Sequence, residues 1–337
     1  MIHPEDLEYH TPADAAHTWA ETCFFAIALP EDHILVTVYA AVRPGIGVML
    51  TDVGIWGALS DNRGDMLYID QQSHQPAPAR FSDIHGPAGL SIRSVRPPRD
   101  YRIDYIGHSG TEIHVDWCSL MEPFDVHDPD HSPNASRHTA DWKKTSGLGE
   151  AWGGHFDLSG RVTGTITVGG KDYAVNSIER MDHSWGHRDL IRMDFSQFSI
   201  SAAFDEDELA FHIITQVDID APTSTQQRFA HGYVLENGQV HGIKEARVVA
   251  NRLRGITTAM EIDVTDVRGR TWRLYAMADV GGPWNAYAGT TTYTLQMIWV
   301  CEHRRGYGCV METIGQPALT QRNARRWEDR QPVWITG

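Results

Sequence analysis

The sequence predicts an all-β protein built from antiparallel sheets, and three observations lead to this class. Runs of alternating, β-branched or aromatic residues recur at short intervals through most of the chain. Hairpin-type turn sequences, such as Gly169-Gly170 and Glu236-Asn237-Gly238, separate these runs. Helical periodicity occurs only over 136–144 and 317–327. This pattern excludes a parallel βαβ fold and favours barrels or sandwiches.

The runs that qualify as strands share high β propensity and a turn signal at one or both ends. In chain order they are 23–29, 33–42, 47–56, 101–106, 112–120, 161–168, 173–178, 195–204, 208–217, 229–235, 245–250, 257–264, 271–278, 293–302 and 307–314.

Residues 122–152 interrupt this pattern with Pro123, Pro129 and Pro133, repeated Asp and His, and several glycines. We expect a crossover between two β modules. The first module would cover 1–178, including the crossover, and the second 179–337. A loop of this length either carries function or acts as a linker, and the sequence leaves both open.

The 337 residues carry a net charge of −15, which repels phosphate backbones and anionic lipid surfaces. We therefore expect no nucleic-acid partner.

No apolar run approaches the ~20 residues of a membrane span, and the first residues do not resemble a signal peptide. We expect a cytoplasmic protein without stable membrane insertion, and the composition leaves a homo-oligomer open. The four cysteines are expected to be reduced, and the basic stretch Arg322, Arg325 and Arg326 to face solvent.

The densest group of polar residues follows the expected strand 173–178 and reads Arg180-Met181-Asp182-His183-Ser184-Trp185-Gly186-His187-Arg188-Asp189. An imidazole exchanges protons near neutral pH, and a carboxylate can orient it. An indole ring stabilises an adjacent positive charge. The alternative is a surface turn with paired charges, but such a turn does not require an indole. The motif therefore indicates an acid–base site.

The segment 160–189, with Gly164, the Gly169-Gly170 turn and this motif, resembles the carotenoid 1,2-hydratase (hydroxyneurosporene synthase)-like proteins. This superfamily of tandem lipocalin-like barrels includes plant-defence-compound hydratases and fungal Diels–Alderases. The chain is most similar to its uncharacterised bacterial members with Asp-His-Ser-Trp-Gly. The resemblance implies two lipocalin-like antiparallel β-barrels or half-barrels in tandem. It also implies cofactor-independent hydration, dehydration, isomerisation or cyclisation of an apolar terpenoid-, polyketide- or steroid-like ligand.

For individual residues, the resemblance implies that His183 protonates a double bond and that Trp185 stabilises the cation. We expect Asp182 or Asp189 to orient His183. Arg188 suits another role, either as the ion-pair partner of Asp182 or Asp189, or as a clamp for a substrate carbonyl or carboxylate. The clamp would favour enol or ketone chemistry.

Further candidates lie in the second half of the chain. Trp284 and Tyr287, in the loop 281–289, suit a lid over a barrel mouth, although they could equally pack on their own barrel. Trp299 is a further candidate for ligand contact. His212 is another, and it lies in Ala210-Phe211-His212, where the related hydratases have Tyr-x-Asp. We expect the glutamates at positions 302 and 312 to face solvent; an inward-facing one, or His212, would supply a second acid or base.

The sequence predicts neither a metal site nor a cofactor. His127 and His131 lack a regular ligand register, and the spacing of His183 and His187 joins ligands only on a helix. The glycine motifs of nucleotide sites and the GxSxG of hydrolases do not occur. An enzyme acting on a hydrophobic small molecule is the leading hypothesis. A non-catalytic binding protein with the same barrels, or a structural module, competes with it.

Overall fold

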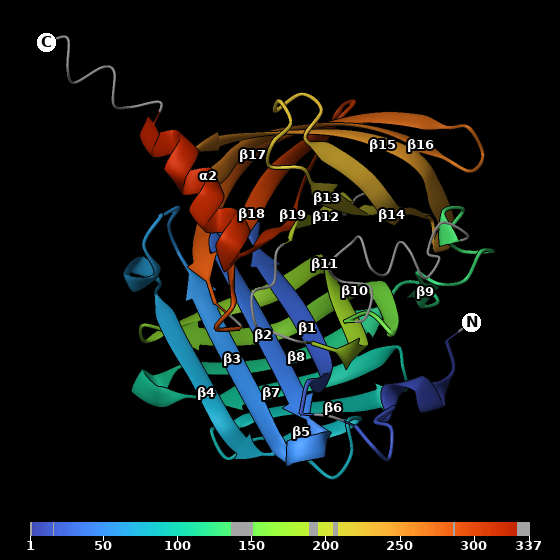
Figure 1. Cartoon of the computed structure of the whole chain (residues 1–337). Helices are drawn as coiled ribbons and strands as arrows, with labels where there is room; N and C mark the ends of the chain where they lie inside the picture. Colours follow the sequence, from blue (N-terminus) through green and yellow to red (C-terminus); the bar gives the residue numbers. More distant parts are fainter. Residues whose placement is uncertain are drawn as a thin grey trace, which may run out of the picture.

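The computed structural model contains two β modules, which lie one above the other in Figure 1. It describes residues 2–15, 17–135, 151–188, 195–204, 208–285 and 287–328. The first module is an open sheet of 11 strands in the order β4-β3-β2-β1-β11-β10-β8-β7-β6-β5, with β9 paired to β10. The second is a closed barrel that runs from β12 to β19 in sequence order.

Neighbouring strands are antiparallel in both modules. The first sheet comprises β1 (Trp19–Leu29), β2 (Ile34–Arg43), β3 (Val48–Trp56), β4 (Tyr68–Pro76), β5 (Asp83–His85), β6 (Leu90–Arg96), β7 (Asp100–Ile106), β8 (Glu112–Ser119), β9 (Phe124–Asp125), β10 (Gly154–Val168) and β11 (Lys171–His187). The barrel comprises β12 (Ser196–Phe204), β13 (Leu209–Val217), β14 (Gln227–Glu236), β15 (Gln239–Leu253), β16 (Ile256–Asp266), β17 (Thr271–Trp284), β18 (Thr290–Cys301) and β19 (Arg304–Gly315). The helical elements are α2 (Gln316–Glu328) and the short 3₁₀ turns η1 (Pro4–Leu7), η2 (Pro30–Asp32), η3 (Pro44–Ile46), η4 (Arg63–Asp65) and η5 (His108–Gly110).

The first sheet curls around its own hydrophobic core. Side chains from β1 to β8, β10 and β11 contribute to one core cluster. The hydroxyl groups of Tyr68 on β4 and Tyr105 on β7 lie 2.5 Å apart, so strands far apart in the sheet order meet across this core. The module is therefore a half-barrel.

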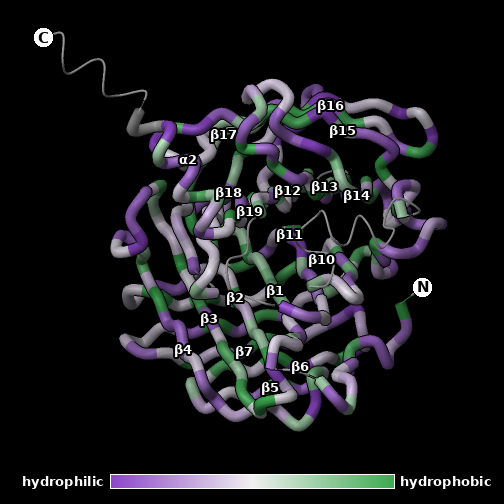
Figure 2. The backbone as a smooth tube through the Cα atoms, in the orientation of Figure 1, coloured by the Kyte–Doolittle hydropathy of each residue, from purple (hydrophilic) through white to green (hydrophobic). Residues whose placement is uncertain are grey.

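The strands in the middle of the first sheet are buried on both faces. Every residue of β1 after Trp19 is buried. Phe25 and Ile27 point into the half-barrel core, whereas Phe24 and Ala26 pack in a second cluster with Trp284 and other barrel residues. Strands covered on both sides read as nearly continuous apolar runs, and Figure 2 shows hydrophobic residues along these strands. The barrel thus packs on the outer face of the half-barrel.

The predicted all-β fold with two tandem barrel modules is confirmed. The helix expected over 317–327 corresponds to α2, whereas 136–144 lies outside the described residues. Strands β4, β5, β6 and β9 were not expected, and β9 lies within the segment 122–152 that was taken as a crossover. The expected division after residue 178 falls inside β11, and the change of sheet comes between His187 and Ser196. In the described part of the chain, no helix is long and apolar enough to cross a membrane.

Glu312 was expected to face solvent, but it is buried. Its carboxylate is buried and accepts hydrogen bonds from Arg252 Nη2 at 2.8 Å and from Arg322 Nη1 at 2.7 Å. Arg322 belongs to α2, so it is not part of a solvated face either. A buried carboxylate requires charged hydrogen-bond donors, and these two arginines tie α2 to β15 and β19. Glu302, by contrast, is exposed as predicted.

Asp52 on β3 is a buried carboxyl group near the junction of the two modules. Trp284 and Gln71 lie beside it, and Arg63 is 4.0 Å away. Burial raises the pKa of Asp52 to about 7. The folded state therefore holds this proton more strongly than the unfolded chain does.

We expect Asp52 to make the stability pH-dependent. The protonated Asp52 contributes to the free energy of unfolding, fully below about pH 4, and this contribution is lost as the pH rises through about 7. For a pKa shift of about three units, the loss is up to about 4 kcal/mol. Asp52→Asn should remove this dependence, so the variant should gain stability relative to the natural chain between pH 4.5 and 8. Urea unfolding at both pH values measures the difference. Asp116→Asn, at an exposed site, is the control, and an equal pH dependence in all three proteins would contradict the prediction.

Candidate functional site

A cavity of about 110 Å³ lies where the half-barrel meets the barrel. Its wall combines side chains from β1, β2, β10 and β11 with others from β12, β13, β17, β18 and β19. The lining residues are Thr22, Phe24, Tyr39, Ala151, Trp152, His155, Asp157, Arg180, Asp182, Ser184, Arg188, Phe195, Gln197, Ser199, Ile214, Trp284, Tyr287, Thr290, Thr292, Met311 and Thr313.

Residues 180–187 of the polar motif form the end of β11 and not a turn. Successive side chains of a strand point to opposite faces. Arg180, Asp182 and Ser184 therefore line the cavity, whereas His183 and Trp185 point to the half-barrel side of the sheet. The strand continues this far because β1 and β10 pair with it on both sides up to Trp185.

Arg188 is held against the cavity by three hydroxyl groups. Its Nη2 donates hydrogen bonds to Thr22 Oγ1 at 3.0 Å and to Ser184 Oγ at 2.5 Å. Its Nη1 donates to the hydroxyl of Tyr287 at 2.5 Å, which is also hydrogen-bonded to the hydroxyl of Tyr39. Burial raises the pKa of Tyr39 well above its usual value, so its phenol keeps its proton at neutral pH. The arrangement places a fixed cation and two phenols at one side of the cavity.

Buried Arg180 and half-buried Asp182 form an ion pair in the same wall, with Arg180 Nη1 3.1 Å from Asp182 Oδ2. Burial raises the pKa of Asp182, and the positive charges of Arg180 and its neighbours offset only part of this rise. Arg180 Nε and Nη2 are buried without a hydrogen-bond partner in the described part of the chain. The Arg180 guanidinium also packs 4.7 Å from the centre of the Phe24 ring.

A second carboxylate, Asp157 on β10, is surrounded by histidines. His155 Nε2 lies 3.2 Å from its Oδ2, and His212 Nδ1 lies 3.4 Å from its Oδ1. Burial acts to raise the pKa of Asp157, but the positive charge of the histidines outweighs it, so the pKa is lowered. His212 also contacts Ser199 Oγ through Nε2 at 3.1 Å. Asp157 thus connects the half-barrel to β12 and β13.

Aromatic rings form much of the rest of the wall. Trp284 lies 6.1 Å from Phe24 and 5.4 Å from Tyr39, measured between ring centres. Trp152 stacks on His155 at 4.4 Å. An apolar pocket with a few convergent polar groups is the usual form of a small-molecule site.

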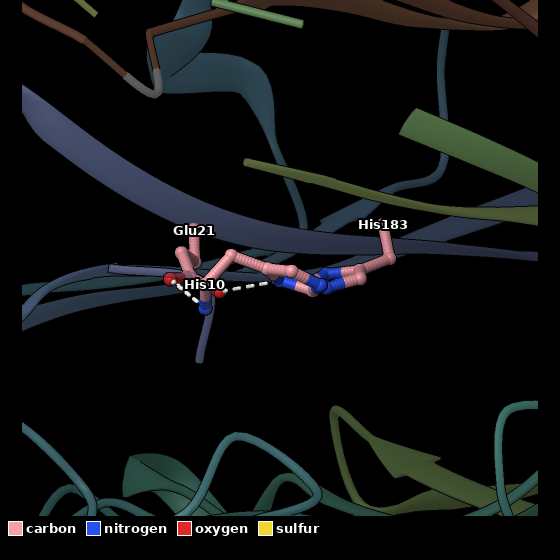
Figure 3. Close-up of side chains that lie close together, drawn as sticks. All are labelled: His10, Glu21 and His183. Atoms are coloured by element: carbon pink, nitrogen blue, oxygen red, sulfur yellow. Dashed lines mark hydrogen bonds and ion pairs between the residues drawn. The ribbon is translucent and has the colours of Figure 1, made fainter. Parts of the chain in front are cut away.

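On the opposite face of β11, His183 is fully buried between Phe81, Phe156 and Trp185. Its Nδ1 donates a hydrogen bond to the carbonyl oxygen of Thr22 at 2.9 Å. Burial lowers the pKa of His183 to about 4, so the ring is neutral at pH 7. Figure 3 shows its ring beside His10 and Glu21.

Trp185 has a packing role that explains the indole in the motif. Its ring lies over Gly154, where an added Cβ atom would meet ring atoms at 2.0 Å, so only glycine fits. On its other side the ring stacks on His10, with 3.7 Å between ring centres and 3° between planes. Trp185 thus holds the segment around His10 onto the sheet.

The sequence-predicted site residues divide into groups. Asp182, Arg188, Trp284 and Tyr287 line the cavity together. His212 stands behind it, in contact with Asp157 and Ser199. His183 and Trp185 do not line this cavity, because strand alternation places both on the other face of β11 from Asp182. That they border the ligand stays a prediction. Trp299 is enclosed in the barrel core, and Asp189 lies outside the described residues.

Other cavity residues were missed by sequence reasoning, among them Tyr39, Asp157 and Arg180. Asp157 lies between the expected crossover 122–152 and the expected strand 161–168, in a segment that was assigned to neither. Tyr39 was placed in the expected strand 33–42, but the sequence of that strand does not show that a second module covers it. Alternation along β11 did contain the signal that Arg180 and Asp182 share a face.

Two solved structures share this architecture at low sequence identity. A candidate AttH of Nitrosomonas europaea superposes with a TM-score of 0.58 and 14% identity, covering 94% of this chain and 96% of that chain. Kievitone hydratase from Nectria haematococca superposes with a TM-score of 0.55 and 10% identity, covering 91% of each chain. Both show that the tandem arrangement of half-barrel and barrel recurs in other proteins.

No curated protein matches the sequence. The family model described as "Domain of unknown function (DUF7064)" matches residues 3–316, which include both modules and every described residue of the cavity. The chain therefore belongs to the DUF7064 family.

Proposed function

We propose that the chain is an enzyme of the lyase or isomerase kind that binds a largely apolar, oxygen-bearing molecule in the cavity between its two modules. One observation carries the proposal. The same cavity brings aromatic walls together with a fixed cation, two phenols and a buried carboxyl group. Terpenoid-, polyketide- and steroid-like molecules have this combination of apolar body and oxygen.

The arginines support an oxygen-bearing ligand. A buried donor without a partner costs roughly 1–3 kcal/mol. Arg180 Nε and Nη2 and Arg188 Nε have no partner in the part of the chain that the structure describes. A carbonyl or hydroxyl oxygen of a ligand would satisfy such donors, which a purely hydrocarbon ligand could not. This favours the clamp alternative for Arg188 over a simple ion pair.

Tyr39, Tyr287 and Arg188 suit the stabilisation of negative charge on that oxygen. Donors that are already oriented stabilise a developing oxyanion strongly, because little reorganisation is needed during the reaction. Arg188 is held by Thr22, Ser184 and Tyr287 before any ligand binds. The group is therefore preorganised.

Asp182 suits proton transfer in the same cavity. In a dehydration, its carboxylate would take a proton from the carbon next to a substrate carbonyl, and the enolate oxygen would be stabilised by Arg188 and the phenols. The protonated Asp182 would then give that proton to the departing hydroxide, which leaves as water. The carboxylate is regenerated, and the reverse sequence adds water to the double bond.

The comparisons support the reaction class without specifying the substrate. The name of kievitone hydratase describes an enzyme that adds water, and it shares this fold with the chain. The resemblance of the motif to carotenoid hydratases points in the same direction. The role of His183 as proton donor stays a prediction, and we do not place it in the proposed step because its ring lies on the other face of β11.

Asp182→Asn should lower turnover by about 10²–10⁴-fold, because the amide cannot carry the proton. The amide keeps the size of the side chain, so ligand affinity should change much less. Steady-state kinetics of the purified variant measure both quantities. Asp116→Asn is the matched control, and equal turnover in the two variants would rule out Asp182 as the base.

Tyr287→Phe should lower turnover by about 10²–10³-fold, because it removes the hydroxyl that joins Arg188 to Tyr39. The ring and its packing remain. Tyr275→Phe makes the same change at an exposed position of the barrel and should leave turnover unchanged. Unimpaired turnover in Tyr287→Phe would show that this hydroxyl has no part in the reaction.

The overall proposal can be tested by mass spectrometry of a lipophilic extract from the purified protein. The recovered compound, and a panel of β-hydroxy ketones with the corresponding enones, are then incubated with the protein in D₂O. An enzyme of the proposed kind should add or remove water, or introduce deuterium at carbon. A compound that binds and stays chemically unchanged would instead identify a binding protein.

A further inference from the structure

Three side chains on the face of the sheet away from the cavity point polar atoms at one another. They are His10 in the segment before β1, Glu21 on β1 and His183 on β11 (Figure 3). His10 Nδ1, Glu21 Oε2 and His183 Nε2 all lie within 4.8 Å of one another, and none has a hydrogen-bond partner in the described part of the chain. Glu21 and His183 are fully buried.

The two carboxylate oxygens of Glu21 have different surroundings. Oε1 accepts hydrogen bonds from His10 N at 2.8 Å, Thr11 Oγ1 at 2.9 Å and Trp19 Nε1 at 3.1 Å. These donors hold the carboxylate in one orientation and favour its charged form. Oε2 is thereby left with its lone pairs directed at the two imidazole rings.

Both imidazole rings have a polar partner for the nitrogen that faces away from the group. A carbonyl oxygen can only accept, so His183 Nδ1 donates to Thr22 and Nε2 holds the lone pair. For His10, Nε2 lies 3.5 Å from Asp6 Oδ1 and Nδ1 lies 3.5 Å from Glu21 Oε2, so each ring nitrogen faces a carboxylate. Metal-binding histidines commonly donate the second N–H to a carboxylate or a backbone carbonyl. With its hydrogen on Nε2, toward Asp6, His10 would direct the Nδ1 lone pair to the same point as Glu21 Oε2 and His183 Nε2.

We propose that His10, Glu21 and His183 bind a divalent transition-metal ion, for which zinc is the appropriate probe. Two histidines and one carboxylate form a recurrent ligand set for zinc and related ions. Ligands of a tetrahedral zinc ion lie about 3.3 Å apart when the bonds are ~2.0–2.1 Å. His10 Nδ1 and Glu21 Oε2 are 3.5 Å apart, close to this value. The fourth position would be open to water.

The ion would serve a positioning purpose in this fold. It would join the segment containing His10 to β1 and β11, directly behind the strand residues that line the cavity. Trp185 already holds His10 in place by stacking. The site was not predicted from sequence, because the ligands are brought together by strand pairing, with Cys23 opposite His183 in the register and Glu21 two residues earlier.

The test uses the full chain, stripped with EDTA and returned to chelator-free buffer. Zn²⁺ is titrated in competition with a chromophoric chelator, and Co²⁺ is added separately to record its visible absorption. We expect one ion per chain, Co²⁺ bands typical of a site with nitrogen and oxygen ligands, and thermal unfolding at a higher temperature with Zn²⁺ than with EDTA.

His10→Gln is the decisive variant, because His10 is partly exposed and its replacement leaves the buried sheet residues unchanged. It should weaken Zn²⁺ binding by at least about 10–100-fold and abolish the thermal shift. The control is His187→Gln, at an exposed position of β11, the strand that also carries His183. This variant should bind Zn²⁺ like the natural chain.

Two results would overturn the proposal. One is that the natural chain binds no Zn²⁺ at one equivalent, which would leave a proton shared between His10 and Glu21 as the explanation. The other is equal binding by His10→Gln and His187→Gln, which would assign the ion to other histidines. Neither result bears on the cavity, because none of the three ligands lines it.

Discussion

Burial of the central strands on both faces is the constraint on which the rest of this structure depends. β1 and β11 have the half-barrel core on one side and the barrel on the other. Where such a strand is covered on both sides, each side chain must be accommodated in an interior, whether apolar or charged. The charged residues of β11 are therefore paired, as Arg180 is with Asp182.

This constraint gives one strand two separate chemical environments. Asp182 and Ser184 contribute to the cavity between the modules, while His183 and Trp185 contribute to the group around His10 and Glu21. The two groups are separated only by the backbone of the sheet. A short sequence motif can thus combine ligand chemistry on one face with a positioning function on the other.

The sequence was sufficient to predict the strands with strong alternation and the pairing of two β modules. β4 was missed because it contains four consecutive polar residues, Gln71, Gln72, Ser73 and His74, which resemble a loop more than a strand. The end of β11 was missed for a related reason, since Arg180 and His183 are polar and yet buried. Polarity marks a turn only where a segment is exposed, and exposure depends on the second module.

The candidate site was predicted in part for the same physical reason. The motif did contain Asp182 and Arg188, and the expected loop 281–289 did contain Trp284, which ends β17, and Tyr287. Alternation separates His183 from Asp182, but it does not tell which of the two faces is hollow. Residues such as Tyr39, Glu21 and His10 come from other parts of the chain, so no local spacing relates them to the motif.

The central claim is that β11 presents Asp182, and not His183, to the ligand. A crystal structure of the chain with the compound recovered from its lipophilic extract tests this most directly. We predict ligand density in contact with Asp182, Arg188 and Tyr287 in the space between the modules. Density for the ligand against His183 and Trp185 inside the half-barrel would contradict the account.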